Sequence, residues 1–344
     1  MPATIHLHVG PHKTGSTAIQ RALLTAREPL REIGLLYPET GQQDAGHHAI
    51  VNAARGWGPA SDGFDADALA RECEGFDHVV LSSENVVHLA RPHLEALRDL
   101  LPPGEVRVIY HLRRLVDWWP SYWQELIKHG QSISAAEFLA GQLGGIHLGG
   151  NLFVNQADQL IRLEAVFGRE AVRIVGYDEM RARDGDLARA LLAEVVGRAD
   201  AAGRVAAEVV NVSKPGWMTE FLRVLNAIHH AETGHGTSAR LRVAALDRRK
   251  TDRFPAEAAF AALVKARSRP LRVDSRGAAI HQQQMRVVRR FKDRFVGDAD
   301  AVEAAYLAQT ERVVPAFDFP VTGEDALRAA LLDWYRTLPE AARA

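Results

Sequence analysis

The sequence has little of several features that would assign a protein to a class at once. Its 344 residues include one cysteine, Cys73, so the chain can form neither an internal disulfide nor a cysteine cluster for zinc. We expect a reduced, partly buried thiol there that is not a nucleophile. The formal net charge is −1, which gives no general attraction to nucleic acid or to an anionic membrane. Any anion-binding site must therefore be local.

Long apolar runs are also missing. No stretch reaches the roughly 20 apolar residues that a membrane-spanning helix needs, and no basic segment followed by an apolar one opens the chain. A strand-like run over residues 4–9 comes almost at once instead. These features predict a cytoplasmic protein without a transmembrane segment.

Short apolar runs alternate with helical spacings over the first 200 residues. The runs predict strands at 4–9, 34–38, 78–83, 106–112 and 171–177, with helices at 17–27, 85–101, 115–129 and 184–197. Such alternation is typical of a doubly wound α/β fold, in which helices cover both faces of a parallel sheet.

Strand signals become rare after about residue 200. The spacings there predict helices at 216–231, 255–267, 278–296, 298–309 and 323–337. We therefore expect a single domain over residues 1–344, with an α/β core to residue 200 and mainly helical additions over 201–344.

The strongest motif follows the first predicted strand, in HVGPHKTGSTAIQ over residues 8–20. A glycine turn between a strand and a helix directs backbone N–H groups toward one point, and the helix N-terminus adds partial positive charge. A lysine and several hydroxyls supply further donors. The candidate ligands of an anion are Gly10, His12, Lys13, Thr14, Gly15, Ser16 and Thr17.

This loop differs from that of the nucleotide triphosphatases. There the lysine follows the second glycine, whereas Lys13 precedes Gly15. No strand end supplies an obvious aspartate for Mg²⁺, although Glu84 stays open for that role. A site without a metal ion suits a transferred group with less charge than a γ-phosphoryl group, and sulfuryl is such a group.

The segment resembles the 5′-phosphosulfate loop of sulfotransferases that use 3′-phosphoadenosine 5′-phosphosulfate (PAPS), and its form is similar to that of bacterial members. The resemblance implies a P-loop fold of the nucleotide-kinase type with PAPS as donor and no metal. It implies that Lys13 acts on the bridging oxygen and helps the leaving phosphate depart. It also implies that Gly15, Ser16 and Thr17 bind the 5′-phosphate.

A second element of the family is an arginine at a strand end with a serine eight residues later, and together they bind the 3′-phosphate. Arg113 and Ser121 have this spacing here, whereas the eighth residue after Arg114 is Tyr122. The arginine fork and the serine hydroxyl both suit phosphate. A basic segment near Arg248 to Lys250 or around Arg276 could close over the nucleotide.

Sulfuryl transfer to a hydroxyl needs a general base, which in sulfotransferases is a histidine or a glutamate. His47 and His48 are candidates because a neutral imidazole suits proton transfer near pH 7. Glu84 is the third candidate, since it follows a strand and open α/β sheets bind ligands at the carboxyl ends of their strands. The residues leave the choice open.

The predicted function is thus transfer of a sulfuryl group from PAPS to a hydroxyl of a glycan or a small molecule. Two alternatives stay open: a phosphotransferase that uses ATP and Mg²⁺, and a non-catalytic nucleotide-binding module. Neither the acceptor nor the oligomeric state can be predicted from these residues.

Overall fold

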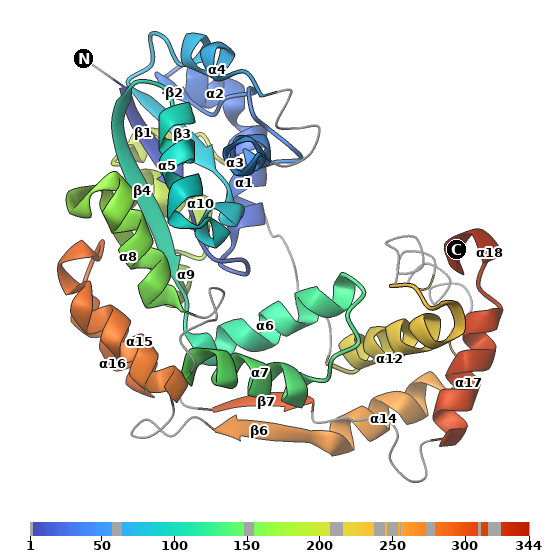
Figure 1. The fold of residues 1–344 in the computed structure, drawn as a ribbon. Coiled ribbons are helices and arrows are strands. Elements are labelled where there is room, and N and C mark those ends of the chain that lie inside the picture. The colour runs from blue at the N-terminus through green and yellow to red at the C-terminus, as the bar shows by residue number, and fades with distance from the viewer. Residues whose placement is uncertain are drawn as a thin grey trace. The chain divides into compact units, whose positions relative to one another are not determined.

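A parallel five-stranded sheet forms the centre of the fold. The computed structural model describes residues 3–56, 64–147, 155–206, 216–236, 245, 254, 256–272, 279–308, 311–315 and 325–343. The strands are β1 (Ala3–His8), β2 (Leu35–Leu36), β3 (His78–Ser82), β4 (Gly104–Leu112) and β5 (Val172–Gly176), in the spatial order β2-β3-β1-β4-β5 (Figure 1). All four pairings are parallel, which confirms the predicted sheet.

Alternate side chains of the strands build two separate cores, one on each face of the sheet. Ile5 and Leu7 of β1 belong to one cluster, and Val80 of β3 and Ile109 of β4 belong to the other. The first face is covered by α3 (His48–Arg55), α4 (Ala66–Glu72), α5 (Arg91–Leu100), α8 (Gln156–Phe167), α15 (Ala279–Arg290) and α16 (Ala299–Ala308). The second is covered by α1 (Ser16–Thr25), α2 (Arg27–Arg31), α9 (Tyr177–Asp184), α10 (Leu187–Ala190) and α11 (Ala199–Ala202). The fold is therefore doubly wound.

Two predicted helices are interrupted. The stretch 85–101 divides into a 3-10 helix, η1 (Glu84–His88), and α5. Pro92 stands in the first turn of α5, where its missing N–H costs nothing. The stretch 184–197 becomes α10 followed by a π-helical turn, η3 (Leu191–Val195).

The chain divides into two compact units, neither continuous in sequence. Unit 1 comprises residues 1–115, 149–211 and 275–309, and unit 2 comprises 116–148, 212–274 and 310–344. The expected division near residue 200 does not coincide with these boundaries. The reason is that α15 and α16 bury Met285, Val288 and Val302 in the core of the first sheet face. Helical spacing in a sequence does not specify which surface such a helix packs against.

Unit 2 contains helices and one small sheet. Its helices are most of α6 (Leu115–Lys128), α7 (Ala135–His147), α12 (Gly216–Thr233), α14 (Glu257–Arg267), α17 (Asp325–Arg336) and α18 (Glu340–Arg343). The sheet pairs β6 (Ser268–Arg272) with β7 (Glu311–Pro315) in antiparallel fashion. This pair was not predicted, because Pro270 and the flanking arginines give SRPLR none of the apolar alternation of a strand.

Within the described ranges, no helix is both long and apolar enough to cross a bilayer.

Gly104 gives a test of the sheet. A Cβ atom at this position would lie 2.2 Å from the carbonyl oxygen of Ala3, its register partner on β1. Because that neighbour is backbone, Gly104→Ala must distort the β1–β4 pairing, and we expect it to lower the free energy of unfolding by about 1–3 kcal/mol. Urea denaturation measures the change. The control is Gly203→Ala, where the nearest atom would be 3.5 Å away; equal stabilities of the two variants would contradict this account.

Candidate functional site

Four neighbouring strands bring their carboxyl ends to one edge of the sheet. In the register, His8 of β1 is level with Ser82 of β3 and Ile109 of β4, and Leu112 of β4 is level with Gly176 of β5. The segments that follow these strands therefore meet at the same edge. They carry the loop at residues 9–15, Glu84, Arg113 and Tyr177. This edge is where open α/β sheets bind ligands.

The loop after β1 is closed by its own contacts. The hydroxyl of Thr14, a buried side chain, donates to the carbonyl of Pro11 at 2.8 Å. A Cβ atom on Gly10 would lie 2.5 Å from that hydroxyl oxygen, so glycine is needed where the loop turns. Thr14 was expected to bind the ligand through its hydroxyl, but in the structure that hydroxyl bonds within the loop.

Two residues of the loop have left-handed backbone. Gly15 has φ 81° and caps α1, and Lys13 has φ 70°. Such a conformation costs a residue with a Cβ atom roughly 1–2 kcal/mol, so the surrounding contacts must hold Lys13 in it. Strain of this kind concentrates at functional sites.

The N-terminus of α1 has the character of an anion site. No side chain in the described part of the chain caps this helix, and no acidic residue lies in its first turn. The hydroxyl oxygen of Ser16 is buried, with 4% of the residue exposed, and has no hydrogen-bond partner among the residues that the structure describes. An unpaired buried hydroxyl is unfavourable, and an anion at the helix terminus would satisfy it. Thr17, half-buried, follows on the same turn.

Arg113 connects the end of β4 to the loop through a hydrogen bond. Its Nη1 donates to the carbonyl oxygen of Lys13, and its guanidinium lies over the ring of Tyr177, 5.1 Å from the centroid. His111, two residues earlier, makes a 3.3 Å contact from Nδ1 to the carbonyl of Thr14. The Nε atom of Arg113 is buried, and no described residue forms a hydrogen bond with it. Arg113 is 9% exposed and lies beside the loop.

Glu84 faces the loop from the end of β3. Its Oε1 is 3.9 Å from Nδ1 of His12, and its Oε2 accepts from Nε2 of Gln20 at 2.8 Å. Gln20 also donates to the hydroxyl of Ser82 at 3.2 Å. The ring of His12 stacks on that of His88. The structure therefore brings Glu84 and His12 of the loop together.

The two adjacent histidines have different surroundings. His47 is buried and bonded at both ring nitrogens: Nδ1 accepts from the N–H of Ser82 at 3.1 Å, and Nε2 donates to the carbonyl of Pro38 at 3.0 Å. Burial lowers the pKa of His47 to about 4. With no ring nitrogen left for a substrate, His47 fastens the segment before α3 to β3 and is not suited to the role of base.

His48 begins α3 and is half-buried. Its Nδ1 lies 2.8 Å from the hydroxyl of Ser83 and 3.4 Å from the amide nitrogen of Asn85. Both partners flank Glu84 in sequence. His48 is therefore held close to the end of β3 through one ring nitrogen, and it is the histidine of the pair that suits proton transfer.

Ser121 belongs to unit 2, whereas Arg113 belongs to unit 1. Within α6 the hydroxyl of Ser121 donates to the carbonyl of Asp117 at 3.0 Å. Nearby, the rings of Trp118 and Tyr122 stack with centroids 4.8 Å apart. The joint role of Arg113 and Ser121 on a 3′-phosphate stays a prediction. The basic segments near Arg248 to Lys250 and around Arg276 lie outside the described residues.

Cys73 ends α4 and is buried on the first sheet face. Burial raises the pKa of its thiol to about 12. A thiol that resists ionisation is a poor nucleophile, in agreement with its expected lack of reactivity.

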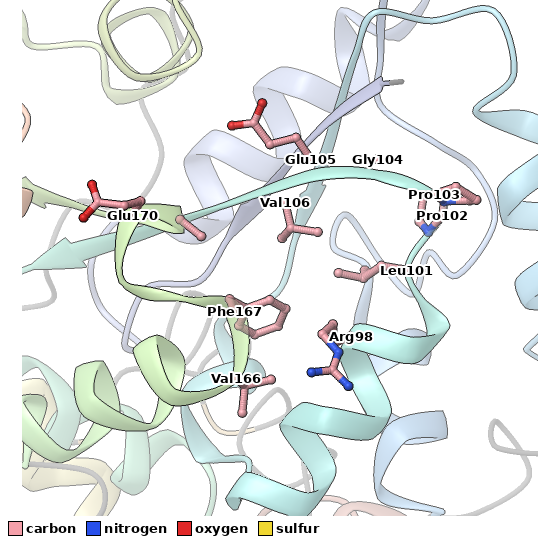
Figure 2. A pocket seen from close by; sticks show the side chains of 11 residues that line it. Arg98, Leu101, Pro102, Pro103, Gly104, Glu105, Val106, Val166, Phe167 and Glu170 are labelled. Atoms are coloured by element: carbon pink, nitrogen blue, oxygen red, sulfur yellow. The ribbon is translucent and has the colours of Figure 1, made fainter. Parts of the chain in front are cut away.

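A cavity of about 550 Å³ lies at the opposite edge of the sheet, beside the start of β4 (Figure 2). Figure 2 shows the apolar side chains of Leu101, Val106 and Phe167 pointing toward one another across it. Its charged residues have partners, since Arg98 bonds Asp99, Glu105 bonds Arg107 and Glu170 bonds Arg294. The charged side chains that line this cavity thus bond to other residues of the protein.

The chain is similar to the crystal structure of a sulfotransferase from Alicyclobacillus acidocaldarius, with 21% sequence identity and a TM-score of 0.38 over 68% of this chain and 97% of that one. No protein-family model and no curated protein matches the chain.

Three residues of the site were missed by the sequence analysis: Gln20, His111 and Tyr177. Gln20 and His111 are polar residues inside otherwise apolar patterns, a helix face and a strand. Buried polar residues need partners, and that signal could have marked both. Tyr177 follows a strand directly, as Glu84 and Arg113 do, and the strand-end argument applies to it equally.

The buried histidines predict sensitivity to acid. Burial lowers the pKa of His47 and His111 to about 4 and that of His6 and His88 to about 3. In the unfolded chain these groups bind protons near the ordinary pKa of about 6.5. The unfolded state therefore binds more protons between pH 6.5 and 4, and the folded state loses stability as the pH falls through that window.

Urea denaturation at several pH values checks this, with His47→Asn as the test variant. In this variant the slope of the unfolding free energy against pH should be smaller than in the wild type, by up to about 1.4 kcal/mol per pH unit. The control is His129→Asn, which removes an exposed histidine and should leave the slope unchanged. A wild-type stability that does not fall between pH 6.5 and 4 would contradict the neutral state of the buried rings.

Proposed function

We propose that this protein transfers a sulfuryl group from PAPS to a hydroxyl of a glycan or small-molecule acceptor. The observation that carries the proposal is the N-terminus of α1, where no described side chain caps the helix or bonds the buried hydroxyl of Ser16. It lies at the strand edge that also holds Lys13 and Arg113. These groups are all donors or cations, as an anionic nucleotide requires.

The residues of the edge fit such a nucleotide. Within the described part of the chain, the hydroxyl of Ser16 and the Nε atom of Arg113 are both buried donors without a hydrogen-bond partner. The described residues contain no group of three or more His, Cys, Asp or Glu side chains that could hold a metal ion. PAPS supplies the sulfuryl group, and we propose that Lys13, Gly15, Ser16 and Thr17 hold its 5′-phosphate while Arg113 and Ser121 hold its 3′-phosphate.

Transfer requires a proton acceptor near the loop, and Glu84 has the better position. Its Oε1 faces His12 of the loop at 3.9 Å, whereas His48 is held beside Ser83 and Asn85. In the proposed step the acceptor oxygen bonds to sulfur as the bond from sulfur to the 5′-phosphate oxygen breaks. The acceptor proton moves to Glu84, and the electron pair leaves with the phosphate. Lys13 stabilises the charge that develops on that oxygen.

Calorimetric titration with 3′-phosphoadenosine 5′-phosphate in EDTA tests the donor site. We expect binding without metal, about 10- to 100-fold weaker in Lys13→Ala and in Arg113→Ala, because each variant removes charge-assisted hydrogen bonds. Arg107→Ala, on the same strand but paired with Glu105, is the matched control and should bind as the wild type does.

The same titration separates the alternatives. Binding of ATP only with Mg²⁺ would contradict the proposal in favour of a phosphotransferase. Tight nucleotide binding without turnover of PAPS on a broad acceptor panel would favour a non-catalytic module.

Turnover of PAPS identifies the base. We expect Glu84→Gln to lower kcat by about 10²- to 10⁴-fold, the usual contribution of a general base, with nucleotide affinity retained. His48→Asn should have a smaller effect, because this histidine neighbours the carboxylate. A larger loss of kcat in His48→Asn than in Glu84→Gln would instead identify His48 as the base.

A further inference from the structure

Gln20 is a polar side chain in a buried position. It lies in α1, soon after the loop, and is 3% exposed. Its neighbours Ile19, Ala22 and Leu23 belong to the core of the second sheet face. A buried amide must find partners, and Gln20 finds both at the end of β3: Ser82 and Glu84.

The hydrogen bonds fix the orientation of this amide. An ionised carboxylate only accepts hydrogen bonds, so the nitrogen of Gln20 faces Glu84. The same nitrogen donates to the hydroxyl of Ser82, which lies 2.8 Å from Nδ1 of His8. Burial lowers the pKa of His8 well below its ordinary value, and the neutral ring can accept from Ser82. Both amide protons of Gln20 are then engaged.

The two oxygens of Glu84 consequently differ. Oε2 is held by Gln20 at 2.8 Å, while Oε1 faces His12 of the loop at 3.9 Å. We propose that Gln20 is a positioning residue: by holding Oε2 it stabilises the ionised carboxylate and leaves Oε1 to receive the proton of the acceptor hydroxyl. This inference rests on the proposed role of Glu84 as base.

Gly46 provides a second way to disturb the same contact. A Cβ atom on Gly46 would lie 2.8 Å from Nε2 of Gln20 and 2.8 Å from Nε2 of His48. Both are ends of side chains, so Gly46→Ala can fold by displacing them. The variant therefore moves the amide of Gln20 without changing its chemistry.

The direct test is the NMR signal of Glu84, in full-length protein labelled with ¹³C at the glutamate carboxyl carbons. Glu84→Gln identifies the signal. In Gln20→Met, which keeps the length of the side chain but removes both donors, we expect the Glu84 carboxyl signal to shift, because the hydrogen bond to Oε2 is lost.

Gln159→Met is the matched control. Gln159 is equally buried in unit 1, where it accepts from the hydroxyl of Tyr110 at 2.6 Å, so its loss should leave the Glu84 signal unchanged. His12 is a titratable neighbour of Glu84, and a second pair of proteins in a His12→Asn background separates its influence. If Gln20→Met does not fold, the same NMR measurement is made on Gly46→Ala.

Turnover adds a readout that a merely structural role would not change. With PAPS as donor, Gln20→Met should lower kcat by about tenfold while binding of 3′-phosphoadenosine 5′-phosphate stays unchanged. The double variant with Glu84→Gln should be no slower than Glu84→Gln alone, because the two residues act through one carboxylate.

The inference and the proposed function fail in different ways. An unchanged Glu84 carboxyl signal in Gln20→Met, or additive losses of kcat in the double variant, would overturn the positioning role. Absence of nucleotide binding in the wild type would overturn the proposed function, and the NMR signal would still decide whether Gln20 holds Glu84.

Discussion

The hydrogen bond from Arg113 to the carbonyl of Lys13 holds the loop after β1 against the end of β4, and the geometry of the site depends on it. Lys13 occupies a left-handed backbone conformation that a lysine adopts only when its surroundings impose it. With the contact from His111 to Thr14, this bond fixes the carbonyls of the loop on the side of β4. Gly15 and the start of α1 come directly after this turn in the chain.

The histidines near this edge restrict where positive charge can lie. Burial keeps the pKa of His47 and His111 at about 4 and that of His8 lower still. Their rings therefore serve as neutral hydrogen-bonding groups at physiological pH. The cationic character of the edge comes from Lys13 and Arg113, which agrees with a protein whose overall net charge is close to zero.

The parallel sheet could be predicted from the sequence for a physical reason. Buried parallel strands such as 106–112 are nearly continuous apolar runs, and a glycine loop between a strand and a helix is a local pattern. The sequence analysis could not place α15 and α16 on the sheet, since a helical spacing specifies an apolar face but not the partner of that face. It missed β6 and β7 because Pro270 and charged residues hide their pairing.

Within the site, the limits of sequence reasoning have the same origin. His47 and His48 are identical as residue types, and only the contacts of His47 with Ser82 and Pro38 separate their roles. The apolar helix face around Gln20 could have marked it as a buried polar residue, but only its bonds to Ser82 and Glu84 show what it contacts. Local patterns thus predict where the site is, and tertiary contacts determine which residue does what.

A crystal structure of the protein with 3′-phosphoadenosine 5′-phosphate tests the central claim most directly. We expect the 5′-phosphate to lie against Lys13 and the start of α1 and to accept a hydrogen bond from the hydroxyl of Ser16. A nucleotide bound away from residues 10–17 would contradict the account, and so would a loop that stays empty at saturating nucleotide.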